Sequence, residues 1–204
     1  MEEQVRPMTS SGIDPLELFA SWYSEASMHP EIADASAVNL ATATRAGWPS
    51  SRMVLLKGYD AQGFAIYTNL GSRKAKDLTG NPRAALCFYW QPLGKQVRVE
   101  GLAEPVGDEE ADAYFSSRPV TSRIGAWASK QSARLESRAK LLARVTRYTA
   151  SFAVGEVNRP PFWSGFRIVP DRMEFWTNAE HRLHDRIVFE KADSGDWRRY
   201  LLYP

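Results

Sequence analysis

The chain has 204 residues, of which 44% are hydrophobic and 25% are charged, so it can form one domain with a sizeable core. Its 26 Lys and Arg against 24 Asp and Glu give a formal net charge of only +2, which argues against a nucleic-acid-binding protein. Cys87 is the single cysteine, which excludes an intrachain disulfide, a cysteine-rich zinc site and an iron–sulfur cluster built within the chain.

The beginning of the sequence, from Met1 to Arg6, lacks the basic and then apolar pattern of a secretory signal. No apolar run approaches the roughly 20 residues that a membrane-spanning helix needs. We therefore expect a cytoplasmic protein with no membrane partner. We expect residues 1–13 to form an N-terminal arm and residues 14–204 to form a single domain.

The first half of the chain reads as one helix followed by strands. Asp14 can cap the helix, Pro15 suits its first turn and Glu17 completes a capping box. A short helix over residues 73–79, with Ser72 as N-cap and Gly80 as C-cap, interrupts the strands. The expected strands are residues 38–44, 51–59, 64–69, 84–91 and 96–106.

The second half of the chain mixes helices and strands. A helix begins at Asp108, and residues 136–152 form a longer one. Strands are expected at 162–169, at 172–176 with the stretch that follows it, and at 197–203. Short antiparallel strands at this spacing predict a mainly β fold with helices, of the α+β class, built as a barrel or sandwich.

Two of the three histidines fall in one stretch, residues 181–186, together with two arginines and an aspartate. Its flanks read as extended chain, and strand alternation would then place Arg182, His184 and Arg186 on one face. Two guanidiniums beside an imidazole suit a planar, anionic ligand. A solvated edge strand explains the same residues equally well.

Two further groups could bind anions. Gly71 to Lys74 lies at a predicted strand-to-helix turn, where backbone N–H groups and two cations could meet one phosphate. Tyr114, Arg118 and Ser122 follow helical spacing, although Pro119 should end or kink that helix. For each group, ordinary polar residues at a solvated helix end are the commoner explanation.

The segment from Arg52 to Lys57 is an apolar strand bracketed by cations. The odd spacing places the two cations on opposite faces of a regular strand, so one ligand reaches both only across a bulge or at the strand end. The sequence contains none of the common glycine-rich nucleotide-binding, metalloprotease or serine-hydrolase motifs, and we expect no metal site.

Taken together, these motifs closely resemble the pyridoxamine 5'-phosphate oxidase family. The match runs from about Asp14 to the C-terminus with the motifs in the same order, which is far more specific than any one of them. The runs that carry the resemblance are Arg52-Met53-Val54-Leu55-Leu56-Lys57, Tyr67-Thr68-Asn69-Leu70-Gly71-Ser72-Arg73-Lys74, Ser117-Arg118-Pro119, Ile124-Gly125-Ala126-Trp127-Ala128-Ser129-Lys130-Gln131-Ser132, Phe175-Trp176 and Arg182-Leu183-His184-Asp185-Arg186.

The resemblance implies an FMN-binding split β-barrel with Greek-key antiparallel strands and peripheral helices. It further implies a homodimer in which each flavin lies between the subunits. Arg73 and Lys74 would serve the FMN phosphate. The residues that it implies at FMN are Arg52, Met53, Val54, Leu55, Lys57, Tyr67, Thr68, Arg73, Lys74, Gln96, Gln131, Ser132, Trp176 and Arg186.

The implied substrate is a phosphorylated B6 vitamer, pyridoxine or pyridoxamine 5'-phosphate. Its C4' carbon would give a hydride to FMN, and dioxygen would then take the electrons, yielding pyridoxal 5'-phosphate, hydrogen peroxide and, from the amine, ammonia. The phosphate carries about −1.5 to −2 charges, which cationic residues can match. The resemblance places Lys57, Tyr114, Arg118 and Ser122 at this phosphate, and Arg182 and His184 over the ring as catalytic residues.

The chain departs from the family pattern at both ends. The family's N-terminal arm carries arginine and tyrosine, whereas Arg6 is the only such residue before Asp14. The family's C-terminal pattern places arginine where this chain has Leu201, and Arg198 or Arg199 could compensate.

Two other functions fit parts of the pattern. A related FMN oxidase of another aromatic substrate, as in phenazine biosynthesis, would not need the phosphate-binding set of Lys57, Tyr114, Arg118 and Ser122. A non-catalytic protein that binds flavin or pyridoxal phosphate would not need Arg182 and His184.

Overall fold

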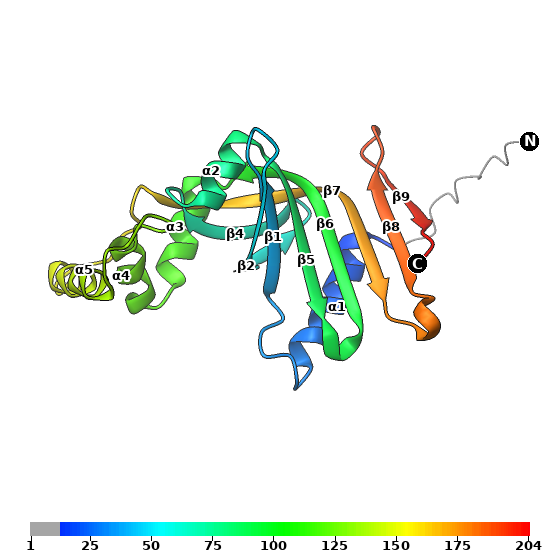
Figure 1. Ribbon diagram of the computed structural model, residues 1–204, viewed down its shortest axis with the longest axis horizontal. Coiled ribbons are helices and arrows are strands. Elements are labelled where there is room, and N and C mark those ends of the chain that lie inside the picture. Colours follow the sequence, from blue (N-terminus) through cyan, green and yellow to red (C-terminus); the bar gives the residue numbers. More distant parts are fainter. Residues whose placement is uncertain (1–12) are drawn as a thin grey trace, which may run out of the picture.

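The computed structural model describes residues 13–204, so the arm predicted for residues 1–13 lies almost wholly outside the described residues. Within the described part, nine strands form one antiparallel sheet (Figure 1). The strands are β1 (Ala37–Ala43), β2 (Pro49–Leu55), β3 (Gly58–Asp60), β4 (Gly63–Asn69), β5 (Arg83–Trp90), β6 (Lys95–Pro105), β7 (Trp163–Thr177), β8 (Asp185–Lys191) and β9 (Trp197–Leu201). The order is β2-β1-β5-β6-β7-β4-β3, with β8 paired to β7 and β9 to β8.

Five helices accompany the sheet in residues 13–204: α1 (Pro15–Met28), α2 (Arg73–Gly80), α3 (Asp108–Ser117), α4 (Val120–Ala128) and α5 (Arg138–Ser151). The predicted N-caps of the first two are confirmed, because Asp14 accepts from the Leu16 N–H at 2.6 Å and Ser72 accepts from the Ala75 N–H at 3.4 Å. Gly80 does not cap α2 but belongs to it, and Asn81 ends the helix in extended conformation.

A single long strand, β7, joins the two ends of the sheet. Its first half pairs with β4 and its second half with β8, while β6 runs along both halves. The prediction of two separate strands, 162–169 and 172–176, is wrong, because a register shift between Glu100 and Gly101 absorbs the irregularity at Pro170. A Cβ at Gly101 would lie 2.0 Å from the Val169 carbonyl oxygen, so this crossing requires glycine.

The strand predicted at residues 51–59 is broken in two. β2 pairs with β1, and β3 pairs with β4 on the other side of the fold. Between them, the Leu56 N–H donates to Ser36 O at 2.8 Å and the Lys57 N–H to Ala65 O at 2.9 Å. The chain thus changes partner strands at this point, which frees Lys57 from the strand alternation that starts at Arg52.

The main core lies between α1 and the curved sheet. Phe19 of α1 is fully buried, with ring centroids 4.9 Å from Tyr59 and Phe64 and 5.1 Å from Phe88. Edge and tilted contacts of this kind add to the burial of apolar surface. The helix α1 therefore fills the concave side of the sheet, and Ala75 and Leu78 of α2 belong to the same core.

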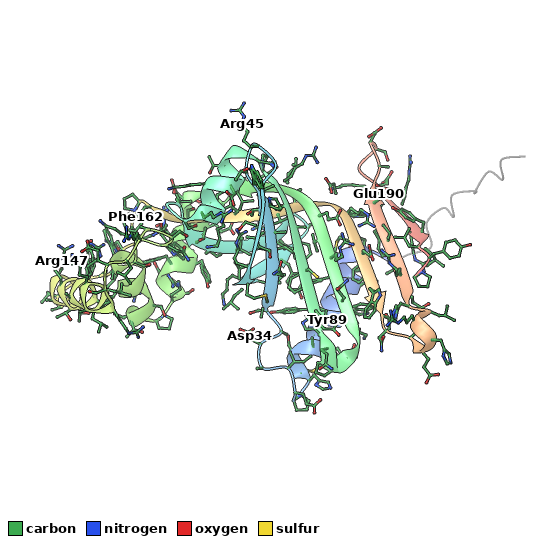
Figure 2. All side chains as sticks on the ribbon, viewed as in Figure 1. Asp34, Arg45, Tyr89, Arg147, Phe162 and Glu190 are labelled. Atoms are coloured by element: carbon green, nitrogen blue, oxygen red, sulfur yellow. The ribbon has the colours of Figure 1, made fainter. Side chains whose placement is uncertain are left out.

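The helices α3, α4 and α5 gather at one end of the molecule and β8 and β9 lie at the other (Figure 1). Figure 2 shows the same separation for labelled side chains, with Arg147 of α5 and Glu190 of β8 at opposite ends. A second apolar cluster, which includes Phe115, Ile124 and Trp163, packs the helical end against the sheet. No helix within residues 13–204 combines the length and apolar character needed to cross a bilayer.

Candidate functional site

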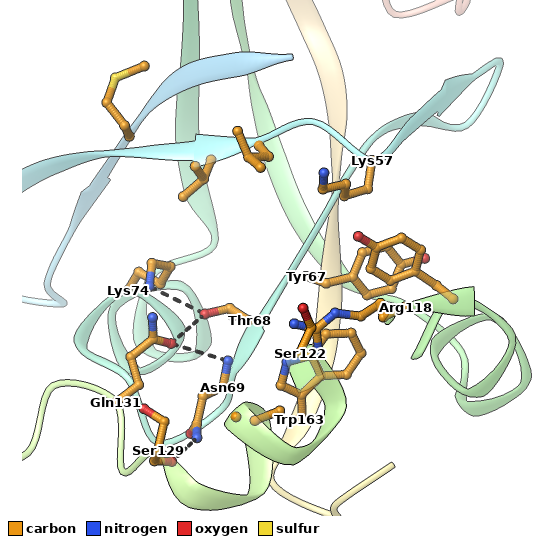
Figure 3. A pocket seen from close by; sticks show the side chains of 16 residues that line it. Lys57, Tyr67, Thr68, Asn69, Lys74, Arg118, Ser122, Ser129, Gln131 and Trp163 are labelled. Atoms are coloured by element: carbon orange, nitrogen blue, oxygen red, sulfur yellow. Dashed lines mark hydrogen bonds between the residues drawn. The ribbon is translucent and has the colours of Figure 1, made fainter. Parts of the chain in front are cut away.

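A cavity of about 510 Å³ lies at the helical end, between β4, α2, α3, α4 and the segment that joins β2 to β3 (Figure 3). Eleven of the predicted site residues line it. One cavity therefore contains most of the residues predicted to bind the cofactor and the substrate phosphate. These eleven are Met53, Val54, Leu55, Lys57, Tyr67, Thr68, Lys74, Tyr114, Arg118, Ser122 and Gln131.

One side of the cavity combines four of the predicted donors. Tyr114 belongs to α3 and Ser122 to α4. Arg118 lies in the break between these helices, where Pro119 interrupts the helix as predicted. The three side chains therefore meet through a helix break and not along one continuous helical face. Lys57 reaches the same space from the β2–β3 connection (Figure 3).

Arg118 is the informative residue of this group. Its Nη1 atom is buried and has no hydrogen-bond partner among residues 13–204. Its guanidinium lies 4.9 Å from the centroid of the Trp163 ring, and burial lowers its pKa. A buried guanidinium nitrogen without a hydrogen-bond partner is costly unless a ligand supplies an acceptor, so this part of the cavity fits an anionic group.

Aromatic rings form one wall beside this cation. The Tyr67 ring stacks on Tyr114, with centroids 4.0 Å apart, and on Trp163 at 5.5 Å. The Tyr67 hydroxyl donates to Glu110 at 2.9 Å, which directs it to α3. Burial, and then this hydrogen bond, raise the pKa of Tyr67, so its hydroxyl stays protonated at neutral pH.

The other side of the cavity is a polar network around Lys74 (Figure 3). Lys74 is 9% exposed, and its Nζ donates to the Thr68 hydroxyl at 3.3 Å. That hydroxyl in turn donates to Gln131 at 3.1 Å. Burial, and then the charge of nearby Arg52, lower the pKa of Lys74. A buried ammonium whose one hydrogen-bond partner within residues 13–204 is a hydroxyl also fits an anionic ligand.

Three predicted cofactor residues lie beside the cavity but do not line it. Arg52 donates to Thr42 Oγ1 at 2.8 Å and to Ser50 Oγ at 2.7 Å, and lies 3.8 Å from the Asp77 carboxylate. The two others, Arg73 and Ser132, are exposed and joined by a bond from the Arg73 N–H to Ser132 Oγ at 3.2 Å.

The remaining five predicted residues form a second group, the C-terminal cluster, of Gln96, Trp176, Arg182, His184 and Arg186. Gln96, Trp176 and Arg186 are neighbours across β6, β7 and β8. The His184 ring lies 4.7 Å from Trp176, and its Nδ1 accepts from the Ala179 N–H at 3.2 Å. None of the five lines the cavity described above.

The prediction of a continuous strand through residues 181–186 is wrong. A short 3-10 turn covers Glu180–Arg182, and β8 begins only at Asp185. His181 and Arg182 adopt positive φ angles of 56° and 63°. Strand alternation therefore does not set the directions of Arg182 and His184, which the turn between β7 and β8 sets instead.

A buried carboxylate, Glu174, holds Arg186 in this cluster. Glu174 is 2% exposed, and Arg186 Nε donates to it at 2.9 Å while Arg186 Nη1 donates to Tyr203 O at 3.0 Å. Arg172 and Arg98 contact the other carboxylate oxygen at 3.1 and 3.4 Å. Burial raises the pKa of Glu174, but hydrogen bonds from Arg186 and Arg172 outweigh it, and the net pKa is lowered.

The C-terminal departure from the family pattern lies next to this cluster. A hollow beside His184 is lined by residues 183–186 and 201–204. Leu201 lines it and is 69% exposed. Neither Arg198 nor Arg199 is among its described lining residues.

Sequence reasoning missed five residues that line the cavity: Asn69, Gly125, Ala126, Ser129 and Trp163. The first four fall within runs that carry the family resemblance, which could have found them. Asn69 fastens the cavity wall, because its Nδ2 donates to Ser129 O at 3.2 Å and its Oδ1 accepts from the Gly71 N–H at 2.8 Å. No local pattern identifies Trp163, which reaches the cavity through packing.

Comparison with known proteins agrees with this geometry. The family model described as pyridoxamine 5'-phosphate oxidase matches residues 25–152. The chain belongs to the pyridoxamine 5'-phosphate oxidase family. A second model, described as the pyridoxine 5'-phosphate oxidase C-terminal dimerisation region, matches residues 163–204, which include most of the C-terminal cluster.

Curated relatives cover nearly the whole chain. The pyridoxine/pyridoxamine 5'-phosphate oxidase of Mesorhizobium japonicum is 53% identical over 191 residues, 94% of this chain and 93% of the relative. The protein of the same name from Maricaulis maris is 56% identical over 192 residues, 94% of this chain and 86% of the relative.

Solved structures confirm the predicted split-barrel fold of the α+β class. PhzG from Burkholderia lata 383, in complex with tetrahydrophenazine-1-carboxylic acid, is 33% identical with a TM-score of 0.88, over 96% of this chain and 95% of that one. A pyridoxamine 5'-phosphate oxidase-related, FMN binding protein from Nostoc punctiforme has a TM-score of 0.74 at 14% identity, over 95% and 100% of the two chains, which is a likeness of fold alone.

Glu174 predicts how stability depends on pH. Because its pKa is lowered on folding, its ionised form stabilises the protein above the unfolded carboxyl pKa of about 4.3, and this contribution is lost as pH falls through the lower folded value. We expect Glu174→Gln to lower the free energy of unfolding by about 3 kcal/mol at pH 7, because three arginines lose a buried partner. The difference in unfolding free energy between wild type and Glu174→Gln should narrow below about pH 4.

Urea unfolding at fixed protein concentration across pH 3–8 measures this effect. Glu104→Gln is the control, since Glu104 is an exposed carboxylate of β6 with no ion pair within residues 13–204. An equal gap between wild type and Glu174→Gln at every pH would contradict the assignment.

Proposed function

We propose that the chain is an FMN-dependent oxidase that converts pyridoxine or pyridoxamine 5'-phosphate to pyridoxal 5'-phosphate with dioxygen as acceptor. The observation that carries this proposal is the buried, unpartnered Nη1 atom of Arg118, which is half-buried beside Lys57, Tyr114 and Ser122. A phosphate monoester supplies the charge and acceptor oxygens that this group requires. The relatives at 53% and 56% identity support the same substrate class.

FMN would occupy the Lys74 side of the cavity. Lys74 and the exposed Arg73 would bind its phosphate at the start of α2, and Thr68 and Gln131 would hydrogen-bond to it. When bound, FMN supplies a hydride acceptor that dioxygen can reoxidise. The aromatic wall would limit access of water beside Arg118, which would strengthen the interaction of this cation with a bound phosphate.

The phosphate-binding residues would orient the substrate. Lys57 and Arg118 neutralise its charge, while the Tyr114 and Ser122 hydroxyls direct its oxygens. A substrate held at its phosphate has less freedom to lose on the way to the transition state. Arg182 would then stabilise negative charge that develops on the pyridine ring oxygen, and His184 would position the ring or move a proton.

These two groups of residues cannot meet around one small molecule within a protomer. Trp163, which lines the cavity, and Trp176, in the C-terminal cluster, lie at opposite ends of β7, roughly 40 Å apart along a strand that rises about 3.3 Å per residue. A complete site therefore requires the C-terminal cluster of a second copy. The match to a C-terminal dimerisation region supports a homodimer with FMN at the subunit interface.

Turnover is the direct test of the proposed reaction. FMN-loaded protein mixed with pyridoxine 5'-phosphate under anaerobic conditions should bleach the flavin absorption, and in air it should form aldehyde and hydrogen peroxide in equal amounts. Pyridoxine without phosphate is the matched control and should react far more slowly. Flavin that stays oxidised with either B6 vitamer would indicate a binding protein. Reduction only by tetrahydrophenazine-1-carboxylic acid, the compound bound in the PhzG structure, would instead favour an oxidase of a phenazine-type substrate.

Two substitutions should separate binding from chemistry. Arg118→Ala removes a charged hydrogen-bond donor to the phosphate, so KM should rise by about 10- to 100-fold while flavin reduction at saturation is largely kept. Arg182→Ala should slow flavin reduction by about 100-fold with phosphate binding largely kept. Stopped-flow reduction over a range of substrate concentrations gives both quantities, and equal losses of affinity in the two variants would refute the assigned roles.

Complementation tests the composite site. Arg118→Ala and Arg182→Ala protomers, co-expressed with different affinity tags, form hybrid dimers that contain one native site if each site uses both subunits. At substrate concentrations below KM, purified hybrids should then recover about half of the wild-type activity per dimer. Hybrids no more active than the two parent variants would place the whole site within one subunit.

A further inference from the structure

We propose that Glu110 is a positioning residue that holds the aromatic wall of the cavity in register with the phosphate-binding cation. This role rests on the proposed function, because it assigns Glu110 to the substrate side of that site. Glu110 lies on α3, does not line the cavity and touches neither proposed ligand. It acts through Tyr67 and Tyr114, which do line it.

One carboxylate oxygen of Glu110 binds two partners. The Tyr67 hydroxyl donates to Oε1 at 2.9 Å, and Arg167 Nη2 donates to the same atom at 3.0 Å. Arg167 is fixed in turn by its Nη1 bond to Asp60 Oδ1 at 2.7 Å. Glu110 therefore ties α3 to β4 through Tyr67 and to β7 through Arg167.

The same helix carries the phosphate-binding phenol one turn later. Glu110 and Tyr114 are four residues apart, so they lie on one face of α3. Glu110 holds the Tyr67 hydroxyl while Tyr114 stacks on the Tyr67 ring at 4.0 Å with an interplanar angle of 21°. These two contacts fix the position of α3 on the sheet and its rotation about the helix axis.

The wall continues from Tyr67 to the cation. Tyr67 stacks on Trp163 at 5.5 Å with an interplanar angle of 8°, and the Arg118 guanidinium lies 4.9 Å from the Trp163 ring. A shift of Tyr67 would therefore move the surface against which Arg118 rests. Because the Tyr67 hydroxyl is used by Glu110, Tyr67 presents its ring to the cavity.

Asp112 offers a matched control on the same helix. Its carboxylate accepts from Arg159 Nε at 2.6 Å and is 58% exposed. Without Asp112, Arg159 keeps its bonds to Asp108 Oδ1 at 2.7 Å and to Trp163 O at 2.9 Å. Asp112→Ala removes an acidic side chain and an ion pair from α3, as Glu110→Ala does. It does not remove the bond to Tyr67.

Kinetics of four variants test the role. Glu110→Ala and Tyr67→Phe each remove the same hydrogen bond, so each should raise KM for pyridoxine 5'-phosphate by about 3- to 10-fold, with kcat changed by less than about 2-fold. The double variant should be no worse than Glu110→Ala alone, because Glu110→Ala already removes the bond that Tyr67→Phe removes. Glu110→Gln keeps an acceptor oxygen for Tyr67 and should restore most of the affinity, and Asp112→Ala should leave KM unchanged.

Direct binding keeps this role separate from the proposed reaction. Calorimetric titration of the FMN-loaded protein with inorganic phosphate should show weaker binding in Glu110→Ala and unchanged binding in Asp112→Ala, even if no substrate is oxidised. Thermal unfolding checks that the variants remain folded. If Glu110→Ala does not fold, Glu110→Gln and Tyr67→Phe decide the question. Equal KM and phosphate affinity in Glu110→Ala and Asp112→Ala, or additive effects of Glu110→Ala and Tyr67→Phe, would overturn the proposal.

Discussion

The fold depends on one strand that serves two different neighbours. β7 pairs with β4 over its first half and with β8 over its second half, and β6 binds both halves through the bulge at Gly101. The first half supplies Trp163 to the cavity, and the second supplies Glu174 and Trp176 to the C-terminal cluster. Because a strand is stiff and extended, β7 fixes the distance between the two groups and prevents them from closing on one ligand in a protomer.

The charged residues of the protomer fall into the same two groups. Beside the C-terminal cluster, Glu174 is shared by Arg98, Arg172 and Arg186, so the guanidinium of Arg186 is oriented before any ligand arrives. In the cavity, Lys57, Lys74 and Arg118 have no carboxylate partner within residues 13–204. The buried atoms of Lys74 and Arg118 cost stability in the absence of a ligand. Clusters of this kind mark functional sites because an anionic ligand removes the cost.

Local signals predicted much of this arrangement. The caps at Asp14 and Ser72 follow from short-range hydrogen bonding, which the sequence encodes directly. The family resemblance named eleven residues that line the cavity. Spacing alone was less informative: Tyr114, Arg118 and Ser122 do meet, but through the helix break at Pro119, and Lys57 escapes strand alternation because the chain changes partner strands. Trp163, Glu110 and Glu174 act through tertiary contacts, which no local pattern records.

The stretch at residues 181–186 shows why periodicity failed at the point of greatest chemical interest. Its extended flanks favoured a strand, yet His181 and Arg182 adopt positive φ angles of 56° and 63°, which cost non-glycine residues on the order of 1 kcal/mol each. The turn keeps this conformation through the Leu183 N–H bond to Glu180 O and the Ala179 N–H bond to His184 Nδ1. Strain of this kind persists where the surroundings enforce it and gathers at functional sites, so the departure from strand geometry is itself an argument that Arg182 and His184 are held for a ligand.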